Sequence, residues 1–296
     1  MHSVLFFSTG RRNPLELASK KADIFIPDGA TFPEALTRTT HMGIGAHQDD
    51  LEIMAYHGVL ECINSGNKGF MGVVVSNGAG SSRIGAYAAV TDEEMQVIRN
   101  KEQGKAATLG GYSASIILGY PTSILKDPKN DDACHDIRLL IESAKPSVVY
   151  THNLADKHDT HVAVALRTIK AIREISPANR PRKVYGCEVW RGLDWMDDAD
   201  KVALNVSGND ELATSLIRVH DSQVAGGKRY DLATIGRRRA NATYFASHES
   251  DQSDMLIFAM DLTPLIVDIK LDINRFVSRH TEMFASDVAS RLASLS

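Results

Sequence analysis

Short apolar runs with β-strand propensity alternate with longer segments of helical period from about residue 41 onward. The apolar runs lie at 42–46, 72–75, 115–118, 148–151 and 184–189. The helical segments span about 51–65, 92–109, 132–144 and 160–175. This alternation is typical of βαβ units, so we expect an α/β fold with a Rossmann-like, mainly parallel sheet and helices on both faces. Ligands of such sheets bind at the carboxyl ends of the strands, which makes the strand exits the first places to search for a site.

The chain length favours one domain. With 296 residues, a single α/β domain over 41–296 preceded by an N-terminal extension over 1–40 is the simplest division. Within the extension, Phe25–Gly29 resembles a short strand that runs into a turn. The remaining expected elements are a strand at 202–206, helices at 210–220 and 232–245, an apolar stretch at 255–260 and a closing helix from about 263.

Composition and charge exclude several classes of protein. A formal net charge of -4 with interspersed signs gives no basic surface for nucleic acid, and the cluster Arg237–Arg239 is expected on a solvated helix face. Three widely spaced cysteines argue against a disulfide framework. The first residues do not read as a signal peptide, and no apolar stretch approaches the roughly 20 residues of a membrane span. We therefore expect a cytoplasmic protein with no membrane partner; the sequence is compatible with a homo-oligomer and leaves the number of copies open.

The first candidate site lies where the run 42–46 ends. His47 and Asp50 are three residues apart between an expected strand and an expected helix, close enough to bind one ion at the roughly 2.0–2.2 Å that zinc requires. Asp49 lies between them and could act on water as a general base. The alternative is that the two aspartates only cap the following helix.

The second candidate site follows the run 148–151. His158 and His161 precede an amphipathic helix, and Asp156 and Asp159 lie nearby. Two histidines and one carboxylate with an open fourth position form a catalytic zinc arrangement. The same ligand types also suit Fe²⁺, so the residues indicate a metal more firmly than its identity.

These two motifs resemble the PIG-L or LmbE-like family of zinc-dependent de-N-acetylases. The segment Ala46–Asp50 is similar to the family's AHPDD, and His158–His161 is similar to its HPDH or HxxH. The presence of Glu52 makes the first motif most similar to the branch that deacetylates N-acetylglucosaminyl conjugates in bacillithiol synthesis. Further similarities within residues 42–245 are Arg99 with Glu102, Lys145–Tyr150, His220–Gln223 and the region of Arg237.

The resemblance implies an LmbE-like fold and a role for each matching residue. It implies that His47, Asp50 and His161 bind Zn²⁺ and that Asp49 is the general base. It implies that His158, in its protonated form, stabilises the tetrahedral intermediate. Arg99 is then expected to bind a small-molecule amino-sugar substrate, from which the enzyme removes an acetyl group. His220 is a candidate for substrate binding, with a satisfied structural histidine as the alternative.

The sequence departs from the family pattern at positions that affect substrate choice and the orientation of a catalytic histidine. Gln48 replaces the usual proline, and Thr160 stands where the family has an aspartate that orients a histidine, unless Asp156 or Asp159 substitutes. The segment 78–92 is rich in Gly, Ser and Ala and is expected to form a lid, in which Arg83 and Tyr87 could contact substrate. Two alternatives stay open: a hydrolase of a different amide, and a non-catalytic metal- or carbohydrate-binding protein.

Overall fold

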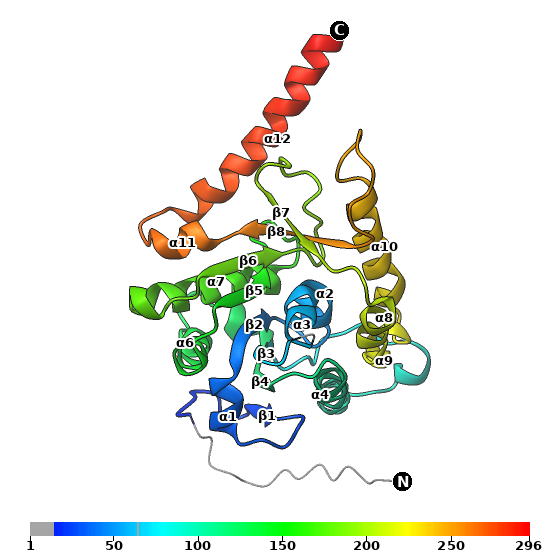
Figure 1. Ribbon diagram of the computed structural model, residues 1–296. Helices are drawn as coiled ribbons and strands as arrows, with labels where there is room; N and C mark the ends of the chain where they lie inside the picture. The colour runs from blue at the N-terminus through cyan, green and yellow to red at the C-terminus, as the bar shows by residue number, and fades with distance from the viewer. Residues whose placement is uncertain (1–14, 64) are drawn as a thin grey trace.

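A single eight-stranded sheet forms the centre of the molecule (Figure 1). The computed structural model describes residues 15–63 and 65–296. Strand order across the sheet is β1-β4-β3-β2-β5-β6-β8-β7. The strands are β1 (Asp23–Phe25), β2 (Thr39–Gly45), β3 (Gly69–Ser76), β4 (Ala114–Tyr120), β5 (Val148–His152), β6 (Lys183–Cys187), β7 (Lys201–Asn205) and β8 (Leu256–Asp261). Strands β4, β3, β2, β5 and β6 are parallel, and the outer strands pair antiparallel. The expected α/β fold with a mainly parallel sheet is confirmed.

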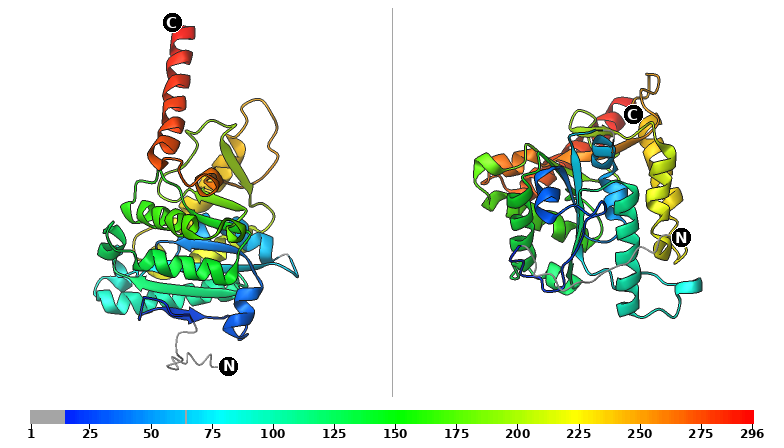
Figure 2. Two further views of the ribbon diagram at one scale, coloured as in Figure 1. Left: turned by 90° about the vertical axis from the view of Figure 1, so that its left-hand side faces the viewer. Right: turned by 60° about the horizontal axis from the view of Figure 1, so that its bottom comes forward.

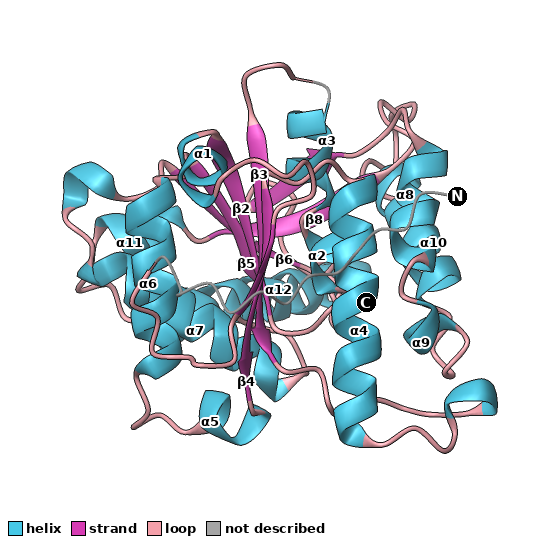
Figure 3. Ribbon diagram, turned by 90° about the horizontal axis from the view of Figure 1, so that it is seen from below, coloured by secondary structure: helices cyan, strands magenta, loops and turns pink. Residues whose placement is uncertain are grey.

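Helices cover both faces of this sheet, as Figure 3 shows from below. One face carries α1 (Phe32–Thr37), α5 (Thr122–Lys126), α6 (Asp132–Ala144), α7 (Asp159–Glu174) and α11 (Thr263–Val267). The other carries α2 (Asp50–Met54), α3 (Tyr56–Ile63), α4 (Asp92–Leu109), α8 (Asp210–Arg218), α9 (Asp221–Val224) and α10 (Tyr230–Thr243). Two 3-10 turns, η1 (Gly85–Tyr87) and η2 (Pro177–Asn179), lie in connecting segments.

The core is divided by the sheet into two apolar layers. Neighbouring residues of β3 alternate between them: Val73 packs in the layer under α6 and α7, and Val74 packs in the layer under α2 and α3. A glycine in β2 brings α2 close to the sheet, because a Cβ atom at Gly43 would lie 3.0 Å from Leu51 and 2.8 Å from Phe70. This close approach fixes the short helix that begins at Asp50.

Residues 15–40 pack against the sheet. Leu17 is 1% exposed, and the Asp136 carboxylate accepts hydrogen bonds from the backbone N–H groups of Ala18 and Ser19 at 2.6 and 3.0 Å. Strand β1, predicted in part at Phe25–Gly29, pairs with β4. Residues 1–14 of the expected extension lie outside the described residues, and the domain boundary at residue 41 stays a prediction.

The segment expected to form one helix over 51–65 forms two. Helices α2 and α3 are separated at Ala55, because the carbonyls of Glu52 and Ile53 accept hydrogen bonds from Arg238 Nη2 at 2.7 and 3.1 Å. Arg238 is 1% exposed and its guanidinium lies over the Tyr56 ring. The expectation of a solvated face for Arg237–Arg239 is therefore wrong for Arg238, whose role in holding α2 comes from a helix almost 190 residues away in sequence.

The expected closing helix consists of α11 followed by α12 (Ile273–Leu295). Helix α12 projects away from the body of the protein, and His280 is its only buried residue (Figure 2). Its exposed apolar side chains include Phe284, Val288 and Leu292. Within the described part of the chain, no helix combines the length and the apolar character that a bilayer crossing requires.

Candidate metal centre and active site

The turn between β2 and α2 holds Asp49 in a conformation that L-residues rarely adopt. Asp49 has a φ of 96°, which is a strained backbone for a residue other than glycine. Two side chains of α4 hold the turn: Arg99 Nη2 donates to the Gln48 carbonyl at 2.6 Å, and Gln103 Oε1 accepts from the Asp49 N–H at 3.4 Å. The Asp50 carboxylate accepts from the His47 N–H at 2.7 Å. Such local strain held by surrounding contacts is typical of functional positions.

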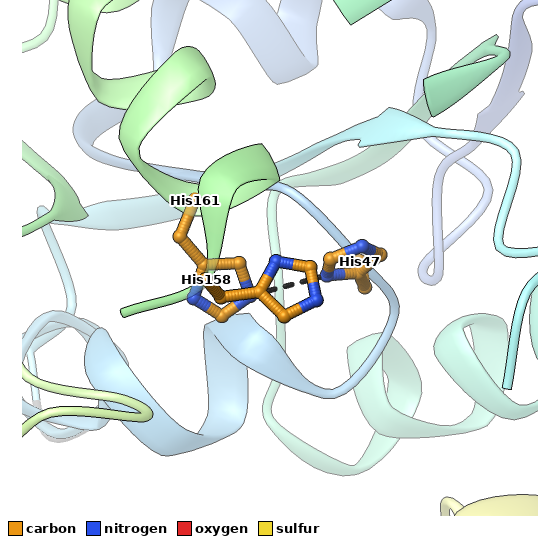
Figure 4. Close-up of side chains that lie close together, drawn as sticks. All are labelled: His47, His158 and His161. Carbon is orange, nitrogen blue, oxygen red and sulfur yellow. Dashed lines mark hydrogen bonds between the residues drawn. The ribbon is translucent and has the colours of Figure 1, made fainter. Parts of the chain in front are cut away.

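Three side chains of the two motifs bring their ligand atoms close together. His47 Nδ1 lies 3.2 Å from Asp50 Oδ2 and 3.2 Å from His161 Nε2, and His161 Nε2 lies 3.5 Å from Asp50 Oδ1. Ligand atoms placed tetrahedrally at about 2.0–2.1 Å around zinc lie roughly 3.3 Å from one another. The distances of 3.2–3.5 Å between the two imidazole nitrogens and the Asp50 carboxylate are therefore compatible with a zinc-sized ion. Figure 4 shows His47, His158 and His161 side by side, brought together from the β2–α2 turn and the start of α7.

His152 lies close to the candidate metal ligands, but the lone pair of its Nε2 atom already accepts a hydrogen bond. With Asp50 and His161 it forms a second group of three possible ligands. Its Nε2, however, accepts a hydrogen bond from the Ala46 N–H at 2.9 Å, so that nitrogen has no lone pair left for a metal. The His152 ring stacks on His161 with a centroid separation of 3.9 Å. Its position supports the ring of a ligand rather than an ion.

Asp156 orients the ring of His161. Its Oδ2 lies 3.1 Å from His161 Nδ1, which leaves Nε2 directed at His47 and Asp50. A carboxylate behind a ligating histidine fixes the tautomer and raises the basicity of the ligand nitrogen. Of the two substitutes open at the sequence level for the aspartate missing at Thr160, Asp156 makes this contact, whereas Asp159 lies 3.5 Å from the Lys126 ammonium.

The protonation states of the three candidate ligands suit metal binding. Burial lowers the pKa of His47 and of His161, which favours their neutral, ligating forms. Burial raises the pKa of Asp50, but His161 and His152 outweigh that effect and bring it well below its usual value. An ionised carboxylate and two neutral imidazoles are the forms that coordinate a cation.

Asp49 and His158 line the same cavity as the candidate ligands. Burial raises the pKa of Asp49 to about 7, although the Arg99 guanidinium, 3.5 Å away, opposes the rise. Burial and the neighbouring His161 and His47 lower the pKa of His158 to about 4. His158 is therefore neutral at neutral pH, which differs from the protonated form expected from the resemblance.

The structure separates the four residues expected to bind substrate. Only Arg99 lines the cavity. Arg83 instead bonds its own loop, at the carbonyls of residues 79 and 90, and pairs with the Asp92 carboxylate, while Tyr87 Oη donates to Asp221 Oδ2 at 2.7 Å. Both shape the loop 78–92, whose residues 80–82 reach the cavity, so direct contact of these two side chains with substrate is not supported.

His220 is buried behind the site rather than exposed to it. It is 0% exposed, and its Nε2 lies 3.0 Å from Glu52 Oε2. Glu52 Oε1 also accepts from Tyr112 Oη at 2.7 Å and from Gln103 Nε2 at 2.9 Å. Burial lowers the pKa of His220, but Glu52, with Asp49 and Glu102, outweighs this and the net shift is upward, which favours the cationic form beside the Glu52 carboxylate. This placement favours the structural alternative for His220, which ties the start of α9 to α2, next to Asp50.

Sequence reasoning missed the outer lining of the cavity. Val189 and Trp190 follow β6, and Gln223, Lys228 and Tyr230 come from the segment between α9 and α10. One signal was present, since an aromatic residue directly after the run 184–189 lies at a third strand exit on the same edge of the sheet. The residues after α9 follow no strand, and only the tertiary fold brings them there.

A sequence profile described as "PIG-L: GlcNAc-PI de-N-acetylase" matches residues 42–172, the part that holds both histidine motifs. The match confirms the resemblance of both motifs to this family. A comparison with curated protein sequences found no match.

Solved structures with the same fold come from more than one type of enzyme. N,N'-diacetylchitobiose deacetylase from Pyrococcus horikoshii is 16% identical, with a TM-score of 0.60, and covers 83% of this chain and 98% of its own. The 4-carboxy-2-hydroxymuconate hydratase from Pseudomonas putida is 17% identical, with a TM-score of 0.57 and coverages of 75% and 95%. The zinc-inhibited form of teicoplanin deacetylase Orf2 is 15% identical, with a TM-score of 0.54 and coverages of 75% and 97%. At these identities the likeness concerns the fold, and the reaction of this protein has to be argued from its site.

Proposed function

We propose that this protein is a metal-dependent hydrolase that removes the acetyl group from an N-acetylated amino sugar or glycoconjugate. The observation that carries the proposal is the convergence of His47 Nδ1, Asp50 and His161 Nε2 within 3.5 Å of one another, at the edge of a cavity that Asp49 also lines. The PIG-L profile match and the deacetylases among the structural neighbours support the acetamide as the reacting group. Membership of the bacillithiol branch stays a prediction.

The proposed ligands are His47, Asp50 and His161. Two imidazoles and one carboxylate suit Zn²⁺, and the same donor set accepts Fe²⁺. A divalent ion held there would lower the pKa of water and polarise the acyl carbonyl. Asp156 and His152 keep the ring of His161 in place for this task.

Asp49 is the proposed general base. Its carboxylate would take a proton from the water that attacks the acetamide carbonyl carbon, and a bound cation would keep the carboxyl ionised at neutral pH by lowering its pKa. Neutral His158 would donate an N–H hydrogen bond to the carbonyl oxygen as negative charge develops on it. The proton held by Asp49 would then pass to the leaving nitrogen as the C–N bond breaks. The products would be acetate and a free amine.

Two alternatives stay open, for stated reasons. The hydratase among the structural neighbours shows that this fold supports a different reaction, so cleavage of another bond has to be tested. A non-catalytic metal- or carbohydrate-binding protein had Thr160 as its support, but Asp156 supplies the carboxylate that this departure removed. The hydrolase is therefore the better supported of the two.

The test is acetate release from a panel of N-acetylated amino sugars, with metal analysis of the same sample. We expect wild-type protein to release acetate, and Asp49→Asn to lose about 10²- to 10⁴-fold in kcat, the range of a general base, with its metal retained. Asp159→Asn is the matched control, because Asp159 is exposed and lies at the start of α7 near the same motif. No acetate from any substrate by metal-loaded wild-type protein, or equal rates for both variants, would contradict the proposal.

A further inference from the structure

Helix α12 is held to the body of the protein at its base. The Arg279 guanidinium donates to both oxygens of the Asp200 carboxylate at 2.9 and 2.8 Å, and the rings of Trp195 and Phe284 are 6.3 Å apart between centroids. Further along, each side-chain hydrogen bond that the structure shows for residues 285–296 is made within the helix. The contacts at the base therefore fix the direction of α12, and its outer half projects from the body (Figure 2).

One side of this outer half is apolar. Phe284, Val288, Leu292 and Leu295 are spaced by four, four and three residues, so they form an apolar stripe along one side of the helix. Their exposed fractions are 45%, 40%, 65% and 88%, which means that the body of the protein covers the stripe less and less toward its outer end. Helices in proteins gain most of their stability from packing of such a side. A contiguous exposed stripe of this kind marks a surface for a partner protein or a membrane.

The charges of α12 favour a protein over a membrane. Helices that lie on membranes carry many Lys and Arg side chains, which bind anionic lipids. The sequence of residues 273–295 contains three Arg and no Lys. Two of these Arg are neutralised within the chain, because Arg279 pairs with Asp200, and Arg291 Nε lies 2.9 Å from both oxygens of the Asp287 carboxylate. The apolar stripe therefore lies beside charges that already have a partner.

We propose that α12 is a dimerisation helix, whose apolar stripe packs against the same stripe of a second copy of this chain. A two-fold contact uses one surface twice, so an apolar stripe is complementary to itself, and the paired charges beside it do not repel the other copy. Two stripes, with the small side chains next to them, bury on the order of 1,000 Å² in total, which reaches the size of a specific interface and predicts a Kd on the order of micromolar. Among the described residues that line the candidate active-site cavity, none belongs to α12, so this interface does not depend on the proposed reaction.

Sedimentation velocity of the full chain tests the interface. We expect wild-type protein to change from monomer to dimer over a concentration series of roughly 0.1 to 100 µM, on both sides of the expected Kd. Leu292→Glu should raise the Kd at least about 100-fold, because the two-fold contact would bury two unpaired carboxylates. Ser290→Glu is the matched control, since Ser290 is exposed and lies about 200° around the helix from Leu292, and it should keep the wild-type Kd. Circular dichroism checks that both variants retain the helix content of wild-type protein.

Cross-linking checks that the dimer forms through α12 itself. The native cysteines Cys62, Cys134 and Cys187 are buried, so a cysteine introduced on α12 is the reactive thiol. Val288 lies near the middle of the apolar stripe and faces its counterpart whether the two helices run parallel or antiparallel. With a short bismaleimide, Val288→Cys should therefore give a covalent dimer, and Ser290→Cys on the opposite side should stay monomeric.

Three results would overturn the dimerisation helix. The first is wild-type protein that stays monomeric at every concentration, and the second is a dimer that Leu292→Glu leaves as stable as that of wild-type protein. The third is monomeric protein that co-sediments with phosphatidylserine–phosphatidylcholine vesicles and loses this binding in Leu292→Glu, which would assign the apolar stripe to a membrane surface instead. Acetate release is measured separately, so failure of the proposed reaction would leave the interface standing.

Discussion

The two ends of the central parallel strands both carry buried and half-buried histidines, with different surroundings. At the carboxyl end, His47 and His161 share contacts with the ionised Asp50. Toward the amino end, His41 Nδ1 lies 2.9 Å from Thr40 Oγ1, and His57 Nδ1 lies 2.9 Å from Tyr150 Oη. The first set directs several ligand atoms at one point, whereas each histidine of the second set is satisfied by a neutral hydroxyl.

Burial alone therefore does not indicate that a histidine is functional. Burial lowers the pKa of His41 and His57 just as it lowers that of His47 and His161. At the carboxyl end a buried carboxylate, Asp50, lies among the histidines, whereas at the amino end the nearby carboxylate, Glu61, is exposed and paired with Lys68. Among the described residues, neither His41 nor His57 belongs to a group of three possible ligands.

The largest expected difference between the two ends is in metal content and activity. His161→Ala removes one of the proposed ligands, so we expect loss of the bound metal and of roughly 10³-fold or more in kcat, which corresponds to several kcal/mol of transition-state stabilisation. His57→Ala at the other end should keep its metal. Elemental analysis and acetate release measure both effects, and circular dichroism checks that both variants are folded. Equal metal content in the two variants would contradict the assignment of His161 as a metal ligand.

The second difference is in stability, because the carboxyl end also contains a buried ion pair. His220→Ala leaves the Glu52 carboxylate without its cationic partner in a fully buried position, and we expect a loss of about 3–5 kcal/mol in the free energy of unfolding. Tyr150→Phe at the amino end removes one neutral hydrogen bond to His57 and should cost about 1–2 kcal/mol. Urea denaturation measures both. A smaller loss for His220→Ala than for Tyr150→Phe would show that the Glu52–His220 pair does not hold α9 to α2.

Sequence patterns predicted the parts of this protein that depend on hydrophobic periodicity and on the position of motifs relative to the strands. The parallel strands follow from their apolar runs, and the meeting of the His47–Asp50 and His158–His161 motifs follows from the two strand exits that the parallel sheet brings to one edge. The choice of His161 over His158 as a ligand came from the family resemblance. The family resemblance is confirmed by the profile match over 42–172. The roles of His47, Asp50 and His161 as metal ligands stay a proposal, but the approach of the two motifs was predictable from the hydrophobic period and from their positions at strand exits.

The parts that sequence patterns did not predict depend on contacts between distant elements. The break between α2 and α3 is made by Arg238 of α10, and the order of residues 15–40 depends on the Asp136 carboxylate of α6. Lys228 reaches Trp190 from the segment that joins α9 and α10. None of these contacts produces a periodic pattern in the sequence. In each case a single side chain of one element hydrogen-bonds to polar groups of another element or packs on its aromatic ring.

The smallest expected difference concerns pH, and it uses the neutral character of the amino end. Burial lowers the pKa of His41 to about 4, whereas the unfolded chain has the ordinary value of about 6.5. Between these two values the unfolded state binds a proton that the folded state excludes. Stability therefore falls as the pH falls through this window, and from pH 7 to pH 5 His41 should account for a loss of about 2 kcal/mol.

Replacing His41 with glutamine tests this assignment at the amino end without touching the candidate metal centre. The His41→Gln variant has no group to protonate there, so its free energy of unfolding should fall less than that of wild-type protein between pH 7 and pH 5, by about 2 kcal/mol. Urea denaturation at both pH values gives the difference, and His248→Gln at an exposed position should follow wild-type protein. If His41→Gln and wild-type protein had the same pH dependence, His41 would exchange its proton equally well in the folded state, and the amino end would not be the dry, neutral counterpart of the metal centre that its hydroxyl contacts indicate.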